Sequence, residues 1–316
     1  MVNETNTNEL SLKLQSSPFH LEEDWFIICE NRNKNCSQKE IDVLIAKEII
    51  NYIDLEIMRL LCRFGFINTY NIGYALSYTL PSGYKKNSYQ RNIQKMVRAG
   101  ILLKYSIRTG NTVDDDYASP MRFYALSAGA RSYIEPHIDI PFSNKLVLSA
   151  YDIINCLAVS QLLIHFLKDH GSDCIVSCRS IIKCKGYKSI ILDGLIQFNK
   201  PSYFRVPTQI ALINIRDSAE SYAHAADRLM DTFHVFKENY SKSDLIIIII
   251  TESVSSIKAI TEVIMLDERM DGVVCPYYYT TDSLLHTDPL FESLFAVTFE
   301  SKDNVAVIKR IHLIPQ

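Results

Sequence analysis

A cationic stripe on a short predicted helix is the feature of this sequence with the clearest chemical meaning. Residues 88–99 (SYQRNIQKMVRA) place apolar side chains at helical spacing on one side and polar or cationic side chains on the other. The cationic side carries Ser88, Arg91, Lys95 and Arg98. A helix of this kind packs on a domain through one face and presents positive charge to a phosphate backbone through the other.

Amide side chains flank the stripe, and further cations lie at both of its ends. Amides hydrogen-bond to the edges of bases, whereas Lys and Arg contact phosphates. The candidate DNA-contacting residues are therefore Lys85, Lys86, Ser88, Gln90, Arg91, Asn92, Gln94, Lys95, Arg98 and Arg108. Two other interpretations stay open at this stage, a solvated helix surface and a surface that binds another protein.

The distribution of charge supports a nucleic-acid partner, although the net charge of the chain does not. The formal charge is −3 over 316 residues. Residues 54–134 hold 11 Lys and Arg and 5 Asp and Glu, a balance of +6, which leaves −9 for the remainder. A basic module within an acidic protein is the expected footprint of one DNA-contacting domain. Asp114–Asp116 would repel phosphate, so we expect the loop that carries them to point away from a duplex.

The elements around the stripe follow the order of a winged helix-turn-helix domain at 37–134. We expect helices at 37–52, 55–64, 70–77 and 88–99, strands at 101–107 and 121–126 around a polar wing at 108–120, and a closing helix at 127–134. Ser37 and Glu40 have the spacing of a capping box, and Asp54 is expected to cap the second helix. Residues 1–36 are expected to form a tail and lead-in segment, and 135–144 a linker.

The second half of the chain changes to an α/β pattern and predicts another domain at 145–316. Expected helices are 145–169, 218–240 and 253–269, and expected strands are 174–183, 188–198, 202–215, 245–251, 272–278, 294–300 and 306–312. The all-apolar strand at 245–251 is typical of the middle of a sheet. The fold class is therefore mixed α/β, with helices around one central sheet in the second domain.

Three segments of the first half, DLEIMRLLCRFGFI, RNIQKMVRAGILLKY and FYALSAGARSYI, resemble the winged-helix region of the replication-relaxation family of Gram-positive plasmids and integrative elements. In the third segment Gly129 takes the position of the glycine usual in that family. The resemblance implies a sequence-specific protein that binds duplex DNA, which we expect to be a homodimer. It also implies a role in replication, transfer or transcriptional regulation of a plasmid or mobile element.

The second half resembles the C-terminal domain of that group, a sheet of the restriction-endonuclease type. Such folds place an Asp on one strand and an acid two residues before a Lys on the next, where they hold a divalent metal. Asp193 matches the first acid, but the next strand has neutral residues at the ligand positions. We expect a degenerate, non-catalytic domain without a metal or other cofactor, used for dimerisation or for binding a partner or ligand. The alternative is a metal-dependent nuclease that uses Asp193 with Asp217 or Glu220.

Other chemistry has little support in the sequence. The chain has no GxxxxGK[ST] or GxGxxG phosphate loop and no GxSxG elbow. Cys174, Cys178 and Cys184 form the one cysteine cluster, and their spacing fits a strand better than a zinc site. No signal peptide is recognised, and the longest uninterrupted apolar run, Leu245–Ile250, is far below the roughly 20 residues of a bilayer span. We therefore expect a cytoplasmic protein with reduced thiols that does not enter a membrane.

Overall fold

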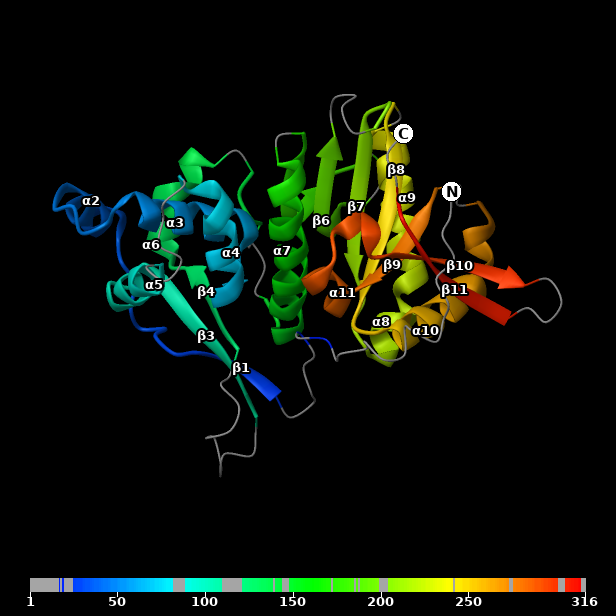
Figure 1. The fold of residues 1–316 in the computed structure, drawn as a ribbon, viewed down its shortest axis with the longest axis horizontal. Helices are drawn as coiled ribbons and strands as arrows, with labels where there is room; N and C mark the ends of the chain where they lie inside the picture. Colours follow the sequence, from blue (N-terminus) through cyan, green and yellow to red (C-terminus); the bar gives the residue numbers. More distant parts are fainter. Residues whose placement is uncertain are drawn as a thin grey trace. The chain divides into compact units, whose positions relative to one another are not determined.

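The computed structural model describes residues 17, 19, 25–81, 89–109, 121–138, 140–143, 148–171, 173–184, 186, 188–198, 204–240, 242–272, 275–300 and 305–313. The chain divides into two compact units. We call them the N-terminal unit (21–168) and the C-terminal unit (169–316, which Ser17 and Phe19 join). Each unit has its own sheet (Figure 1).

The N-terminal unit combines helices with a small antiparallel sheet. Its elements are β1 (Trp25–Cys29), α2 (Gln38–Ala46), α3 (Tyr52–Phe64), β2 (Ile67–Asn68), α4 (Thr69–Thr79), α5 (Tyr89–Arg98), β3 (Leu102–Thr109), β4 (Arg122–Leu126), α6 (Ala128–Ile134), η1 (Glu135–His137) and α7 (Ala150–His170), the last of which belongs to this unit up to Lys168. The strand order is β1-β3-β4-β2, and every pair is antiparallel. The mixed helix and sheet content expected for this region is confirmed.

Side-chain caps set the helix ends, and two of these ends differ from those expected. Ser37 and Glu40 form the predicted capping box at the start of α2. That helix ends at Ala46 rather than at 52, and Glu48 has a left-handed backbone with φ of 56° that cannot continue a helix. Asn51, not Asp54, caps α3, while Asp54 completes the capping box from the third position of the helix.

The segment expected to be a linker contributes a ring to the core of the N-terminal unit. Phe142 is 2% exposed, and its N–H donates to the carbonyl of Cys62 at 2.7 Å. Gly65 ends α3 with φ of +79°, and a Cβ there would lie 2.7 Å from the ring of Phe142. Glycine therefore satisfies both the left-handed backbone and the close approach of this ring.

By length and composition alone, α7 could cross a membrane, although 72% of its most apolar window is buried inside the structure. The length of apolar runs in the sequence did not indicate this, because polar residues interrupt the helix. Those polar side chains bond within the N-terminal unit: Ser160 Oγ donates to the carbonyl of Phe64 at 3.1 Å, and Asn71 Nδ2 donates to Gln161 Oε1 at 3.4 Å. Burial and internal bonding of this kind are typical of a core helix.

The C-terminal unit is a seven-stranded mixed sheet with helices. Its elements are β5 (Ile175–Ile182), β6 (Ile190–Phe198), β7 (Thr208–Asn214), α8 (Ala219–Ala223), α9 (Ala225–Asn239), β8 (Asp244–Thr251), α10 (Val254–Met265), η2 (Glu268–Gly272), β9 (Tyr277–Thr281), α11 (Asp282–Thr287), η3 (Leu290–Glu292), β10 (Leu294–Glu300) and β11 (Val305–Ile311). Its strand order is β11-β10-β9-β8-β7-β6-β5, in which β7, β8 and β9 are parallel and the other pairs antiparallel. The apolar β8 lies in the middle, as expected, and α9 and α10 pack on one face of the sheet.

Three details of the C-terminal unit correct the expectations from sequence. The long helix predicted after β7 is divided into α8 and α9 at His224. The strand predicted to begin at 272 begins at Tyr277 instead. Ser17 and Phe19, expected in a tail, are buried, and the Ser17 hydroxyl donates to the carboxylate of Asp282.

Candidate nucleic-acid interface

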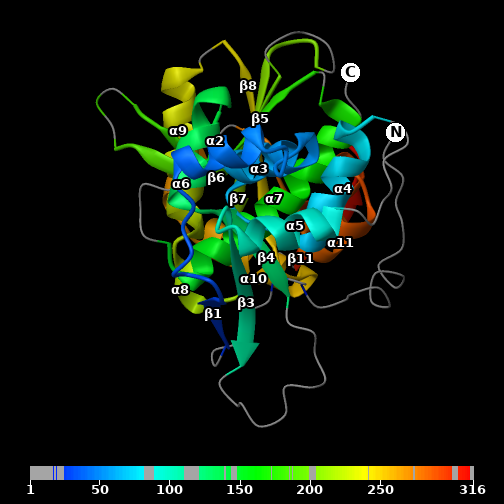
Figure 2. The ribbon, with the colours of Figure 1, turned by 90° about the vertical axis from the view of Figure 1, so that its left-hand side faces the viewer.

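The helix predicted to carry the cationic stripe, α5, has one buried and one exposed side. Ile93 and Met96 are 2% and 1% exposed, and the helix packs against α3 and β3. Figure 2 shows α5 on the side of the N-terminal unit that faces the viewer. The exposed residues on its other side are Gln90, Arg91, Gln94 and Arg98. The apolar stripe thus anchors the helix and leaves two guanidinium groups and two amides in solvent.

Two of the predicted contact residues are engaged inside the protein. Lys95 Nζ forms an ion pair with Asp54 Oδ2 and donates to the carbonyl of Ile49 at 2.8 Å. The Asn92 amide donates to Asp54 Oδ1 at 2.8 Å. Asp54 is fully buried, and its charge is tolerated because these groups satisfy it. Lys95 and Asn92 therefore hold α5 on α3, and the structure gives both side chains partners within the N-terminal unit.

The β3–β4 hairpin adds cations that lie on one face of the small sheet. Arg122 lies opposite Ser106 in the register of β3 and β4. Side chains two residues apart in a strand point to the same face, so Lys104, Arg108 and Arg122 share one face of the sheet. Lys104 is paired with Glu30. Burial raises the pKa of Glu30, but the hydrogen bond from Lys104 and the charges of Lys104 and Arg108 outweigh it and lower the pKa. Arg108 and Arg122 are both exposed.

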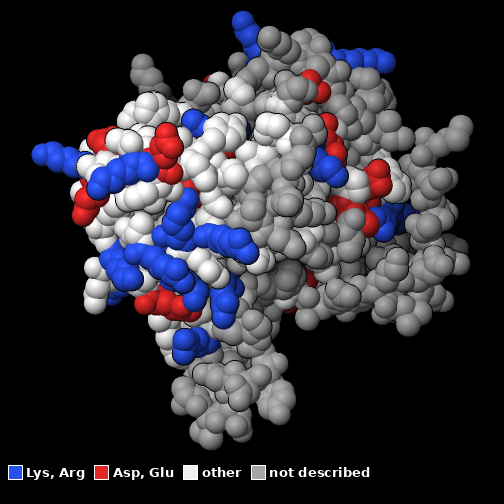
Figure 3. Space-filling model, turned by 60° about the vertical axis from the view of Figure 1, so that its left-hand side comes forward, with Lys and Arg blue, Asp and Glu red and all other residues white. Residues whose placement is uncertain are grey.

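We call Arg91, Arg98, Arg108 and Arg122 the basic surface. Among the described residues, no carboxylate forms an ion pair with any of these four guanidinium groups. Figure 3 shows Lys and Arg side chains gathered on one face of the N-terminal unit, with few acidic side chains among them. Solvated arginines that are not neutralised by neighbours retain their full charge for an anionic partner.

The structure leaves some predicted residues untested and adds one that sequence reasoning missed. Lys85, Lys86 and Ser88 lie outside the described residues, as do wing residues 110–120 with Asp114–Asp116. Arg122 was not predicted as a contact residue. The sequence nevertheless indicated Arg122, because it is the first cation after the polar loop and begins the return strand.

The acid that matched a nuclease motif, Asp193, is neutralised within the C-terminal unit. Arg228 reaches it from α9, and the guanidinium Nη2 forms an ion pair with Asp193 Oδ2. The same carboxylate oxygen accepts the N–H of Asn214 at 2.7 Å. Arg228 Nη1 also donates to the carbonyl of Asn214 at 2.6 Å. These bonds fix Asp193 between β7 and α9 and occupy one of its two carboxylate oxygens.

The other candidate acids belong to different networks. Asp217 Oδ1 accepts the hydroxyl of Tyr222 at 2.7 Å, and the Asp217 N–H donates to Glu252 Oε1 at 3.2 Å. Burial, together with this hydrogen bond to Asp217, raises the pKa of Tyr222 to about 12. Glu220 is exposed on α8. Within the part of the chain that the structure describes, no three His, Cys, Asp or Glu side chains are placed to hold a metal ion.

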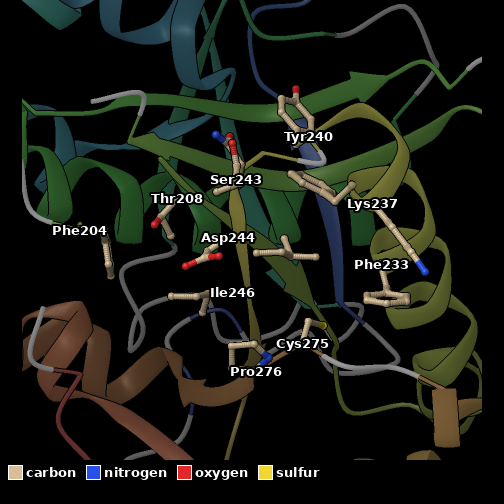
Figure 4. Close-up of a pocket in the computed structure, with 13 residues that line it drawn as sticks. Phe204, Thr208, Phe233, Lys237, Tyr240, Ser243, Asp244, Ile246, Cys275 and Pro276 are labelled. Atoms are coloured by element: carbon tan, nitrogen blue, oxygen red, sulfur yellow. The ribbon is translucent and has the colours of Figure 1, made fainter. Parts of the chain in front are cut away.

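A pocket of about 710 Å³ lies at the amino ends of β7, β8 and β9 (Figure 4). Its lining mixes aromatic rings with charges of both signs, including Asp244 and Lys237. The Lys237 ammonium lies 5.8 Å from the centre of the Phe233 ring. Burial raises the pKa of Cys275 to about 11, so this thiol is not poised as a nucleophile. The pocket therefore has no arrangement that indicates a particular reaction.

Comparison with known proteins adds no assignment. No protein-family model, curated protein or solved structure matches the chain. The functional proposal therefore rests on the sequence and the structure of the chain itself.

Proposed function

We propose that the N-terminal unit binds duplex DNA and that α5 is its recognition helix. The observation that carries this proposal is the exposed side of α5, where Arg91 and Arg98 accompany Gln90 and Gln94. Arginines contact phosphates or guanine, and glutamines read adenine edges. The helix contains no acidic residue, and the Lys95–Asp54 ion pair holds it in a defined orientation. A rigid helix with an open polar face is suited to the major groove.

The arrangement of elements supports a winged helix-turn-helix. Helices α3, α4 and α5 precede the β3–β4 hairpin, and β2 between the first two helices pairs with β4, which gives the sheet order β3-β4-β2. In such a module Arg108 and Arg122 would contact the phosphates beside the groove occupied by α5. The sequence resemblance adds the proposal of a homodimer that acts on plasmid or mobile-element DNA, in replication, transfer or regulation.

For the C-terminal unit we propose a non-catalytic relative of the restriction-endonuclease fold. Three antiparallel strands, a helical crossover and a parallel fourth strand follow one another from β5 to β8. This order supports the resemblance inferred from sequence. The ion pair between Arg228 and Asp193 supports the loss of catalysis, because a guanidinium, not a metal, balances the charge of this carboxylate.

Salt dependence tests the DNA proposal. The parent protein is expected to bind mixed-sequence duplex DNA with an affinity that falls as salt rises. The slope of log affinity against log salt is negative. Arg91→Ala and Arg98→Ala should each reduce its magnitude by about 0.9, because each removes one phosphate contact. Lys39→Ala is the matched control, since Lys39 is an exposed cation on α2. Fluorescence anisotropy at several salt concentrations measures the slopes, and equal slopes for the parent and both arginine variants would refute the assignment of α5.

Cleavage assays test the proposal for the C-terminal unit. We expect no nicking of plasmid DNA with magnesium or manganese, by the parent or by Arg228→Ala, which releases Asp193 from its ion pair. One carboxylate without a neighbouring acid and lysine does not hold the metal while charge builds on the phosphate. Asp193→Ala is the control. Nicking by the parent that disappears in Asp193→Ala would restore the nuclease alternative.

A further inference from the structure

A second cavity, distinct from the basic surface, lies within the N-terminal unit. It is a cleft of about 910 Å³, which is near the upper end for small-molecule sites. Tyr105 lines it and alternates along β3 with Lys104, Ser106 and Arg108, so the cleft and the hairpin cations lie on opposite faces of the sheet. Its described lining residues all fall between Ile27 and Ile153, within one unit.

The walls of the cleft are apolar and their shape is fixed. The ring of Phe66 meets Tyr105 edge to face with centroids 5.6 Å apart, and it meets Phe142 in the same way at 6.3 Å. Aliphatic side chains complete the lining, among them Ile27, Leu103 and Ile153. Aromatic pairs in this geometry add about 0.5–1.5 kcal/mol beyond the burial of their area. The cleft is therefore preformed for a ligand with a flat or aliphatic body.

Arg131 supplies one positive charge to this cleft. Its Nη1 donates to the carbonyl of Phe142 at 2.9 Å, and its guanidinium carbon lies 5.7 Å from the centre of the Phe142 ring. That is its one hydrogen bond among the described residues, whereas a guanidinium has five N–H donors. Burial lowers the pKa of Arg131, although the charge of Glu135 opposes this. The guanidinium is partly desolvated, which strengthens a bond to an anion.

Arg32 supplies a second positive charge from a loop that is fixed in place. Asn31 Nδ2 donates to the carbonyl of Leu102 at 2.8 Å, and the N–H of Cys36 donates to the carbonyl of Gly100 at 3.0 Å. Between these anchors the exposed Arg32 lines the cleft. Burial raises the pKa of Tyr105 to about 12, and the charge of Arg32 acts in the opposite direction, which indicates that the two groups are close.

We propose that this cleft binds a small organic anion with an aromatic or aliphatic body and one carboxylate, sulfonate or phosphate group. The body would lie against the wall that Phe66, Tyr105 and Phe142 form, and the anionic group would meet Arg32 and Arg131. Two cations beside apolar walls favour such a molecule over a neutral or cationic one. The concave, apolar shape favours it over a DNA backbone. This inference does not depend on DNA binding by α5.

Calorimetry with 2-naphthoate tests the inference, with the neutral 2-naphthamide as its matched ligand. The parent protein is expected to bind the carboxylate at least about tenfold more tightly than the amide, because charge-assisted hydrogen bonds are about twice as strong as neutral ones. Arg32→Gln should reduce that preference, with Arg131 keeping part of it, and leave amide binding unchanged. Ser132→Trp, at an exposed position that lines the cleft, should weaken both ligands by filling the space.

Arg91→Gln is the control variant, because Arg91 belongs to the basic surface, and its affinity for 2-naphthoate should equal that of the parent. Equal affinities of the parent for carboxylate and amide, or no binding at millimolar concentration, would overturn the proposal. Competitive displacement of 2-naphthoate by duplex DNA would also overturn it, since the cleft would then belong to the nucleic-acid surface. Arg32 and Ser132 are both exposed, so neither substitution is expected to prevent folding.

Discussion

Replacing Asp54 with alanine should lower the free energy of unfolding of the N-terminal unit by about 3 kcal/mol, the low end for breaking a buried ion pair. The low end applies because the Lys95 side chain is 33% exposed and can regain water, whereas Asp54 is fully buried. Asn92 also loses one of its two acceptors and keeps the other, Asn51 Oδ1. Urea unfolding followed by Trp25 measures the change, because Trp25 is the one tryptophan of the chain and lies in this unit.

Glu56→Ala is the matched control on the same helix. Glu56, 16% exposed, pairs with Arg59, 39% exposed, and losing this partly exposed pair should cost about 1 kcal/mol. A similar loss for both variants would mean that the Asp54 network does not stabilise the unit.

Asp54→Ala also distinguishes two roles of the Asp54 network, through the sign of its effect on DNA binding. Removing Asp54 takes away a negative charge and releases the Lys95 ammonium, so electrostatics alone would strengthen binding to DNA. If α5 must instead be held in a defined orientation, binding weakens although the unit becomes more basic. We expect weaker binding, measured without urea at a temperature where the variant is folded. Tighter binding would show that Lys95 acts as a DNA contact once it is released.

Asp282→Ala should destabilise the C-terminal unit by about 4 kcal/mol, because it leaves the Arg216 guanidinium buried without its carboxylate. The side chains of this pair are 4% and 1% exposed, and Arg216 Nη2 also donates to Asp282 Oδ1 at 3.3 Å. Ser17 loses an acceptor as well. Hydrogen exchange of the β8 amides reports the change, since that strand lies in the middle of the sheet.

Asp288→Ala serves as the control for this measurement. Asp288 pairs with Arg310, and their side chains are 32% and 27% exposed, so its loss should cost about 1 kcal/mol or less. The double variant Arg216→Met/Asp282→Leu should recover most of the stability, because apolar side chains of similar volume can replace a buried pair. Unchanged stability of Asp282→Ala would contradict a structural role for the pair.

Local features of the chain were accessible from sequence because they depend on residues that are close along it. The apolar stripe of α5 follows from helical periodicity, and Ile93 and Met96 are buried as that stripe requires. The capping box of Ser37 and Glu40 acts over three residues. The continuous apolar run of β8 indicated a strand in the middle of a sheet, and that is its position.

Partners that are distant along the chain were decided by the tertiary structure alone. Lys95 belongs to the same stripe as Arg91 and Arg98 by spacing, but it binds a carboxylate 41 positions away. Periodicity shows which side of a helix is polar and says nothing about which polar group faces a neighbouring element. Asp193 looked like a metal ligand by its motif, and Arg228, 35 positions away, neutralises it.

The cleft of the N-terminal unit was also decided by the tertiary structure alone. Arg32, Tyr105 and Arg131 show no common spacing in the sequence, and pairing of β1 with β3 and packing of α6 bring them to one cavity. The sequence therefore determined the local elements, the basic module and the mixed α/β class. The tertiary structure decided which charges are neutralised and which stay exposed, because the energy of a charge depends on its surroundings in space.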